Sequence, residues 1–97
     1  MPQSVSGFAA YCLSDDELAV VHKPTGRRFP IRGRVRDVYR ALSYARGRVL
    51  HRHDLLDIIW RGCGVYQNVV ESIQNLRNKV APEVVETVGK WQGYIVR

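Results

Sequence analysis

One side of a helix predicted over residues 68–80 carries amide and carboxylate groups, which can form directional hydrogen bonds with nucleic-acid bases. Apolar residues recur at gaps of four, three and four and form the opposite side of this helix: Val69, Ile73, Leu76 and Val80. The polar side consists of Gln67, Glu71, Gln74, Asn75 and Asn78, with Asn68 at its edge. Amides bond bidentately to adenine, and a carboxylate accepts from N4 of cytosine. The pattern therefore predicts base recognition leaning towards A·T pairs, and the alternative is an ordinary hydrated helix surface.

Basic residues lie beside this polar side and not on it. Arg77 and Lys79 flank the apolar residues and can reach phosphates next to a groove, although an internal ion pair is an equal alternative for Arg77. Arg52 lies at the start of an earlier predicted helix, whose exposed N–H groups can receive a phosphate. Because the polar side itself lacks Arg and Lys, we expect little affinity for guanine and for DNA of arbitrary sequence.

Catalytic and metal-binding patterns are absent from the sequence. It contains no glycine-rich phosphate loop, no GxSxG and no HExxH motif. His51 and His53 are two residues apart, so they face different directions on a helix and lack a third ligand at suitable spacing. Cys12 and Cys63 have no CxxC partner and are expected to be reduced thiols, although one bridge between them stays open. We expect no enzymatic activity, no metal and no other cofactor.

The apolar spacing of an amphipathic helix occurs three times along the chain. It is found in Val35, Val38, Tyr39 and Leu42, then in Leu55, Leu56, Ile59 and Trp60, and finally in the helix over residues 68–80. This third helix is expected to begin at an N-cap, Asn68, with Glu71 at N3 in a capping-box arrangement. Two glycines, Gly62 and Gly64, predict a loop over residues 61–67 between the second and third helices.

Three short runs of strand-forming residues precede the helices and predict a small antiparallel sheet. They cover residues 7–13, 17–22 and 27–31. Pro30 has no N–H to donate, so the third run must be an edge strand or include a strand end. We expect residues 1–7 to be flexible.

Two further runs, over residues 84–88 and 93–96, predict a hairpin after the third helix. Lys90 and Trp91 occupy its tip. A tryptophan at a loop tip is unfavourable in water, so Trp91 is expected to pack against a DNA sugar, a partner or its own domain. The order of elements is sheet, three helices and hairpin, which defines an α+β winged helix-turn-helix fold with a small N-terminal sheet.

The composition is typical of one basic globular domain over residues 1–97. Hydrophobic residues make up 45% of the chain, charged residues 25%, and the formal net charge is +6. Such a domain favours polyanionic partners, with nucleic acid first and an acidic membrane surface or acidic protein second. No apolar run reaches the ~20 residues of a membrane span, and no secretory signal begins the chain. We therefore expect a cytoplasmic protein without a membrane partner.

The charge is unevenly distributed. Residues 27–61 contain ten arginines against three aspartates, a net charge of +7. The arginines at the start of this segment can bind phosphate, bind an acidic partner or only keep the chain soluble. An acidic corner, formed by Asp15, Asp16 and Glu17, precedes them. One hypothesis from this asymmetry is that the acidic corner of one copy meets the arginines of residues 27–40 in the next copy.

Three segments resemble the OmpR/PhoB-type C-terminal DNA-binding domain. Residues 49–60 resemble its "vvsreeLl..vW" segment, and residues 73–80 resemble its "I..LR.Kl" recognition helix, with amides where the family is often arginine-rich. Residues 87–94 resemble its wing, "TVrG.GY", or "TVpkrGY" in the ToxR/CadC branch. This wing is one residue longer than usual. The resemblance covers residues 8–97 and includes the small N-terminal sheet.

The resemblance implies a bacterial, sequence-specific, double-stranded DNA-binding transcription regulator. It places the helix over residues 68–80 in the major groove and the wing tip, residues 89–92, near the minor groove or the backbone, where Lys90 is attracted. It also implies that the loop over residues 61–67 can touch RNA polymerase and that copies bind cooperatively to repeated half-sites. The alternative is a winged helix that docks on RNA polymerase or another regulator. The chain is either a stand-alone effector domain or part of a longer protein.

Overall fold

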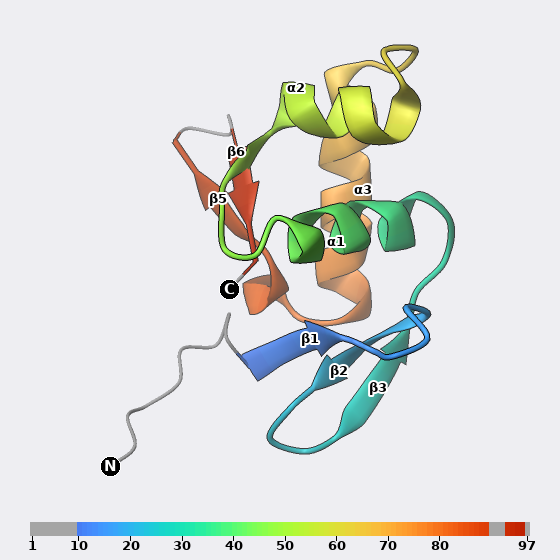
Figure 1. Cartoon of the computed structure of the whole chain (residues 1–97), viewed down its shortest axis with the longest axis vertical. Helices are drawn as coiled ribbons and strands as arrows, with labels where there is room; N and C mark the ends of the chain where they lie inside the picture. Colours follow the sequence, from blue (N-terminus) through green and yellow to red (C-terminus); the bar gives the residue numbers. More distant parts are fainter. Residues whose placement is uncertain (1–9, 90–92, 97) are drawn as a thin grey trace.

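The computed structural model of the chain describes residues 10–89 and 93–96 (Figure 1). Lys90 and Trp91, which the sequence assigns to the wing tip, lie outside the described residues, as does segment 1–7. Among the residues that are described, no helix combines the length and the apolarity needed to cross a bilayer.

The N-terminal sheet has the predicted antiparallel arrangement. It consists of β1 (Tyr11–Leu13), β2 (Ala19–His22) and β3 (Arg27–Pro30), paired in that order. The central strand presents Val20, which is fully buried, to the core. Pro30 ends the edge strand, where a missing N–H is tolerated.

Two helices, α1 (Gly33–Tyr44) and α3 (Tyr66–Lys79), pack against each other and supply much of the core. The predicted apolar stripe of α1 is buried in full: Val35, Val38, Tyr39 and Leu42. On α3, Ile73 and Leu76 are at most 1% exposed. Burying each of these side chains is worth about 1.5–3 kcal/mol, so the apolar side determines how α3 is rotated about its axis. The polar side of α3 consequently faces outward.

The second helix has two parts. α2 (Arg52–Leu55) begins at the N-cap His51, whose backbone N–H donates to Asp54 Oδ2 at 3.0 Å. It continues as a π-helical turn, η2 (Leu56–Trp60), and ends at Arg61, which has a left-handed backbone with φ 53°. The residues predicted to be buried here are Leu55, Leu56, Ile59 and Trp60. Leu55 alone among them is fully buried, because the wider π-turn alters the spacing and leaves the other three half-buried at the core's edge.

The C-terminal hairpin follows a short 3₁₀ turn, η3 (Pro82–Val84). Its strands are β5 (Glu86–Val88) and β6 (Gly93–Ile95), which pair antiparallel. β5 therefore begins two residues later than the sequence pattern predicts, because Pro82 opens a helical turn that takes in Val84. The hairpin itself is confirmed.

A third strand of the wing sheet was not predicted. β4 (Leu50–His51) pairs with β6, so the sheet order is β4-β6-β5 and the C-terminal strand lies in the centre. A side chain at Gly93 would clash with this arrangement, since a Cβ there would lie 2.6 Å from Val49 Cγ1 and 3.3 Å from the carbonyl oxygen of Leu50. Glycine at this position allows β4 and β6 to approach.

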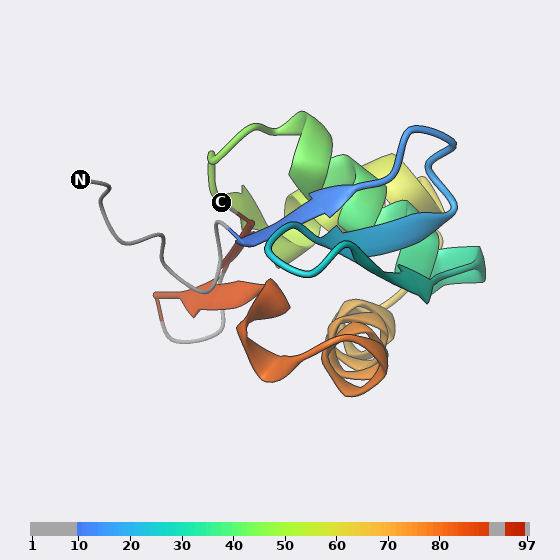
Figure 2. The same cartoon turned by 90° about the horizontal axis from the view of Figure 1, so that it is seen from below.

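The elements together form a winged helix-turn-helix with a small N-terminal sheet, the predicted fold class. In Figure 2, α3 is seen nearly end-on below α1 and the N-terminal sheet, and β5 lies towards the same side as α3. The outward side of α3 and the wing therefore border one face of the molecule.

Candidate functional site

The polar side of α3 is a continuous exposed surface, here called the α3 face. Five of its six predicted members are exposed: Gln67, Glu71, Gln74, Asn75 and Asn78. The sixth, Asn68, is half-buried at the edge, as the helical spacing predicts. The opposite side of α3 is buried through Val69, Ile73 and Leu76, with Ser72 between them. The structure thus brings the amide-rich residues together on a helix whose orientation is fixed by the core.

The start of α3 differs from the prediction. The N-cap is Val65, not Asn68, and Asn68 occupies N3. From there Asn68 Oδ1 reaches back and accepts the backbone N–H of Val65 at 2.8 Å. Gly64 gives this amide room, since a Cβ at that position would lie 2.9 Å from Asn68 Oδ1. The amide therefore ties the helix start to the preceding residue, and the N-cap lies three residues earlier than expected.

Glu71 does not cap the helix. It lies beyond the first turn, where its Oε2 accepts a hydrogen bond from Gln67 Nε2 at 3.4 Å. Both side chains are exposed on the α3 face. The carboxylate consequently belongs to the outward surface and adds a negative charge to it.

Arg77 binds within the chain. Its Nε and Nη2 donate to the carbonyl oxygen of Val85 at 3.2 and 2.8 Å, and Nη2 also donates to Thr87 Oγ1 at 2.8 Å. These partners are on and beside β5, so neither alternative considered from the sequence, a phosphate contact or an internal ion pair, anticipated them. Lys79 is exposed at the last residue of α3. It borders a hollow of about 530 Å³ whose other walls include Phe29 of the N-terminal sheet.

Arg52 lies at the first position of α2, and its guanidinium stacks on Tyr66 at the first position of α3. The Arg52 Cζ atom is 4.3 Å from the centre of the Tyr66 ring. Tyr66 remains 43% exposed. Burial raises the pKa of the Tyr94 hydroxyl on β6, and the nearby charges of Arg77 and Arg52 oppose that rise. The two arginines therefore lie close enough to the wing sheet to act on it electrostatically.

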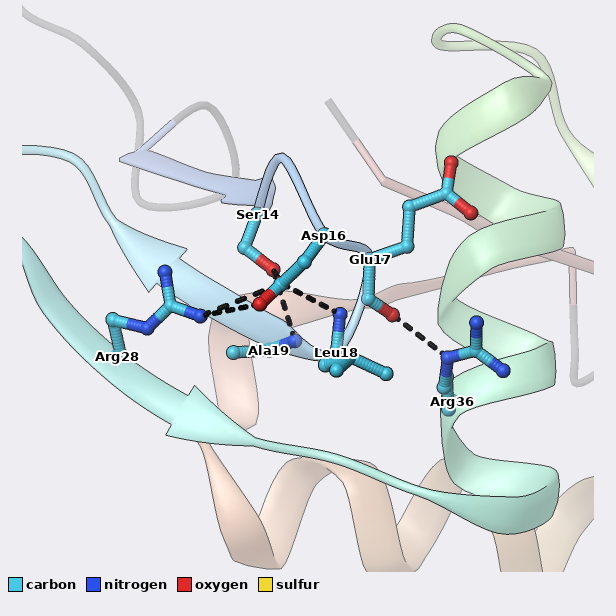
Figure 3. Close-up of polar contacts among 7 residues, drawn as sticks. All are labelled: Ser14, Asp16, Glu17, Leu18, Ala19, Arg28 and Arg36. Carbon is cyan, nitrogen blue, oxygen red and sulfur yellow. Dashed lines mark hydrogen bonds and ion pairs between the residues drawn. The ribbon is translucent and has the colours of Figure 1, made fainter.

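The acidic corner forms hydrogen bonds and an ion pair with other residues of the same chain (Figure 3). Asp16 accepts hydrogen bonds from the Ser14 hydroxyl at 2.6 Å and the Leu18 N–H at 3.1 Å, and it pairs with Arg28 at 3.3 Å. These contacts, the Ser14 hydrogen bond foremost, hold the pKa of the Asp16 carboxyl below its ordinary value. Ser14 also accepts the N–H of Ala19, so the corner is closed by a hydrogen-bond network.

Glu17 connects this corner to α1. Its backbone carbonyl accepts from Arg36 Nε at 2.8 Å (Figure 3), and its carboxylate pairs with Arg40 at 3.2 Å and accepts from the Tyr44 hydroxyl. Glu17 has a left-handed backbone, φ 62°, an uncommon conformation for a residue with a side chain. Arginines of another copy could therefore bind this corner only by displacing the Arg28 and Arg40 partners that its carboxylates already have within the chain.

A groove of about 610 Å³ runs between α1 and η2. Arg34 lies across it, with its Cζ atom 5.3 Å from the Trp60 ring and its Nη1 donating to the carbonyl oxygen of Ile59 at 3.4 Å. Ile58 at this groove is 56% exposed, and Val65 in the predicted 61–67 loop is 63% exposed. The second helix and the following loop thus present apolar side chains to solvent.

Groups that could hold a metal do not come together in the described part of the chain, where no three His, Cys, Asp or Glu residues cluster. His53 is 3.7 Å from Asp57, a contact that becomes an ion pair only when the imidazole is protonated. Cys12 is half-buried, Cys63 is exposed, and both are free thiols.

Solved structures share this architecture. The DNA-binding domain of Bacillus subtilis CssR is 24% identical with a TM-score of 0.68, covering 90% of this chain and 99% of its own. The DNA-binding domain of E. coli CadC is 23% identical with a TM-score of 0.70, covering 91% of this chain and 86% of its own. The C-terminal domain of NsrR, a lantibiotic response regulator, is 16% identical with a TM-score of 0.70, covering 99% of this chain and 96% of its own.

No protein-family model and no curated protein sequence matches the chain. The structural likeness concerns the fold: the winged helix-turn-helix that the OmpR/PhoB-type resemblance implies is confirmed.

Proposed function

We propose that the chain is a sequence-specific, double-stranded DNA-binding transcription regulator. The observation that carries this proposal is the α3 face, an exposed row of amides on a helix held by its buried side in a winged helix-turn-helix. A recognition helix of this kind lies in the major groove and presents side chains to base edges. The similar structures of CssR and CadC are described as DNA-binding domains, which supports the assignment.

Base recognition follows from the chemistry of the α3 face. Gln74, Asn75 and Asn78 can each donate and accept in one plane, which suits the N6 and N7 positions of adenine. Glu71 accepts only and suits the amino group of cytosine. The face carries no cation to bond with guanine, so we expect sites rich in A·T pairs.

Phosphate contacts are assigned to residues around the α3 face. Arg52 and Lys79 lie at opposite ends of the helix-turn-helix, one at the start of α2 and one at the end of α3. Lys90 and Trp91 are assigned to the wing tip, near the minor groove or the backbone. Arg77 contributes indirectly, because it joins α3 to β5.

The proposal is tested by selecting duplexes from a random pool and measuring the affinity of the best and of arbitrary sequences over a salt series. We expect selection of A·T-rich half-sites and affinity that falls steeply with salt, as counterion release requires. Absence of measurable binding to any duplex at low salt would refute it.

A second candidate function is a protein-interaction module that docks on RNA polymerase or on another regulator. The exposed apolar side chains Ile58, Val65 and Tyr66, in and next to the loop over residues 61–65 that joins η2 to α3, favour it. This function predicts binding to RNA polymerase holoenzyme without DNA and loss of that binding when Val65 is replaced by Asp. A DNA-binding regulator that also touches polymerase would show both activities.

A further inference from the structure

The stack of Arg52 on Tyr66 is the closest of the four cation–π contacts in the described residues. Its 4.3 Å separation compares with 5.0 Å for Arg27 on Phe29, and the other two contacts are longer still. It also joins two helices, because Arg52 opens α2 and Tyr66 opens α3. A guanidinium held over the face of an aromatic ring is restrained in position by that contact.

The hydrogen bonding of this guanidinium differs from that of five other arginines in the described residues. Arg36 and Arg77 donate to backbone carbonyls, and Arg28, like Arg34 and Arg40, is in an ion pair. Those contacts consume N–H donors. No described residue accepts a hydrogen bond from Arg52, and its contact with the face of the Tyr66 ring does not occupy a hydrogen-bond acceptor. The stack therefore holds the group while its N–H donors are not used by any residue in the described part of the chain.

The position of the stack on the surface is one that a DNA phosphate can reach. Arg52 is half-buried and Tyr66 is exposed, so the stack lies at the surface next to the first residue of the helix that bears the α3 face. A helix lowered into the major groove brings the flanking phosphates to the ends of that helix. A planar guanidinium with free paired donors matches a phosphate bidentately.

We propose that Tyr66 is a positioning residue that holds the Arg52 guanidinium by stacking and presents it to a DNA phosphate beside the α3 face. The proposal rests on the DNA-binding function proposed above. Tyr66 contributes its ring face and not its hydroxyl. Binding then costs less rotamer entropy, since the guanidinium is already in place before DNA arrives.

The experiment measures affinity for the selected duplex over a salt series with wild type, Arg52→Ala, Tyr66→Ala, Tyr66→Phe and the double Ala variant. Arg52→Ala should lower the slope of log affinity against log salt by about one. Tyr66→Ala should weaken binding at least threefold and lower the slope in the same direction, whereas Tyr66→Phe should bind as wild type does. The double Ala variant should bind no more weakly than Arg52→Ala.

Lys23→Ala is the charge-matched control. Lys23 is in the turn between β2 and β3, at the end of the molecule opposite the start of α3 (Figure 1), and its removal should leave the slope unchanged. Thermal melts establish that each variant is folded, and Tyr66→Leu replaces Tyr66→Ala if the latter is not.

Each outcome has one meaning. Wild type without salt-dependent DNA binding refutes the proposed function itself. Wild type that binds while Arg52→Ala keeps its slope shows that Arg52 meets no phosphate. Loss in Arg52→Ala without loss in Tyr66→Ala, or equal loss in Tyr66→Phe, overturns the positioning role of the ring.

Discussion

Arg77 on α3 holds the carbonyl oxygen of Val85 with two N–H donors, at 2.8 and 3.2 Å, and reaches Thr87 Oγ1 with the first of them. Val85 is buried and Thr87 is on β5. One charged side chain thus connects α3 to the wing strand β5. DNA binding by a winged helix uses helix and wing together, so this contact couples the stability of the fold to the geometry of the proposed interface.

Replacing Arg77 by Ala should therefore affect folding as well as binding. We expect a loss of about 1–3 kcal/mol in the free energy of unfolding, because the buried Val85 carbonyl loses a charged donor. Urea unfolding followed by circular dichroism measures this. Arg77→Lys should recover only part of the loss, since one ammonium cannot reproduce the two-donor contact. Lys79→Ala, two residues away and exposed, is the control, and equal stability of the two Ala variants would contradict the structural role.

Replacing Gln74 or Asn75 by Ala should relax base preference. Each substitution should cost roughly 1–3 kcal/mol on the best site, because an amide that bonds bidentately to a base is removed, while affinity for random DNA stays the same. Competition titrations with selected and random duplexes measure both quantities. Equal losses on the two kinds of DNA would show that these amides do not read bases.

Replacing Glu71 by Gln should raise affinity for random DNA severalfold. The substitution removes a negative charge from the α3 face and keeps the side chain's size, so repulsion from phosphates decreases. Discrimination between selected and random duplexes should fall as a result. Glu83→Gln, an exposed carboxylate on the 3₁₀ turn, is the matched control. The same gain in both variants would indicate a general effect of net charge.

The acidic corner should make stability depend on pH in the acid range. The pKa of Asp16 is lowered in the folded chain, so its contribution is present above the ordinary carboxyl pKa and is lost as the pH falls through the lowered folded value. Asp16→Asn should therefore unfold at lower urea concentration than wild type at neutral pH, with a smaller difference in acid. Asp15→Asn provides the comparison, and identical pH profiles for wild type and Asp16→Asn would contradict the prediction.

Copies of the chain should bind DNA cooperatively when their half-sites lie on one face of the duplex. A single winged helix reads few base pairs, and modules of this size bury only roughly 600–1,000 Å². Shifting one half-site by about five base pairs, half a helical turn, should abolish cooperativity. Native mass spectrometry gives the number of copies bound, and gel titrations of duplexes with the two half-site spacings measure the cooperativity. A 1:1 complex with full specificity would show that pairing is unnecessary.

Periodic burial made most of the fold predictable. The stripe from Val35 to Leu42 and the one from Val69 to Leu76 are buried as predicted, because a helix in a small domain has one side on which to place its large apolar side chains. Val80, predicted as the last member of the second stripe, is the C-cap and is only half-buried. The same reasoning placed the amides of the α3 face outward. When apolar residues repeat over several helical turns, the pattern predicts which side of the helix is buried, and single tertiary contacts do not change that side.

Short and non-local features escaped prediction. β4 has two residues and exists because β6 lies beside it, so nothing in its own sequence marks it as a strand. Asn68 was assigned to the N-cap by its residue type, yet it acts from N3 by reaching back to Val65. The stack of Arg52 on Tyr66 depends on the loop between them, whose path no periodicity encodes.

The central position of β6 in the wing sheet has a consequence for how the chain folds as it is made. β4 and β5 are both synthesised before β6, and neither pairs with the other. A nascent chain that has emerged only as far as β5 therefore exposes two strand edges with no partner between them. Chaperone binding and aggregation should be greatest at that length and should fall once residues 93–96 have left the ribosome.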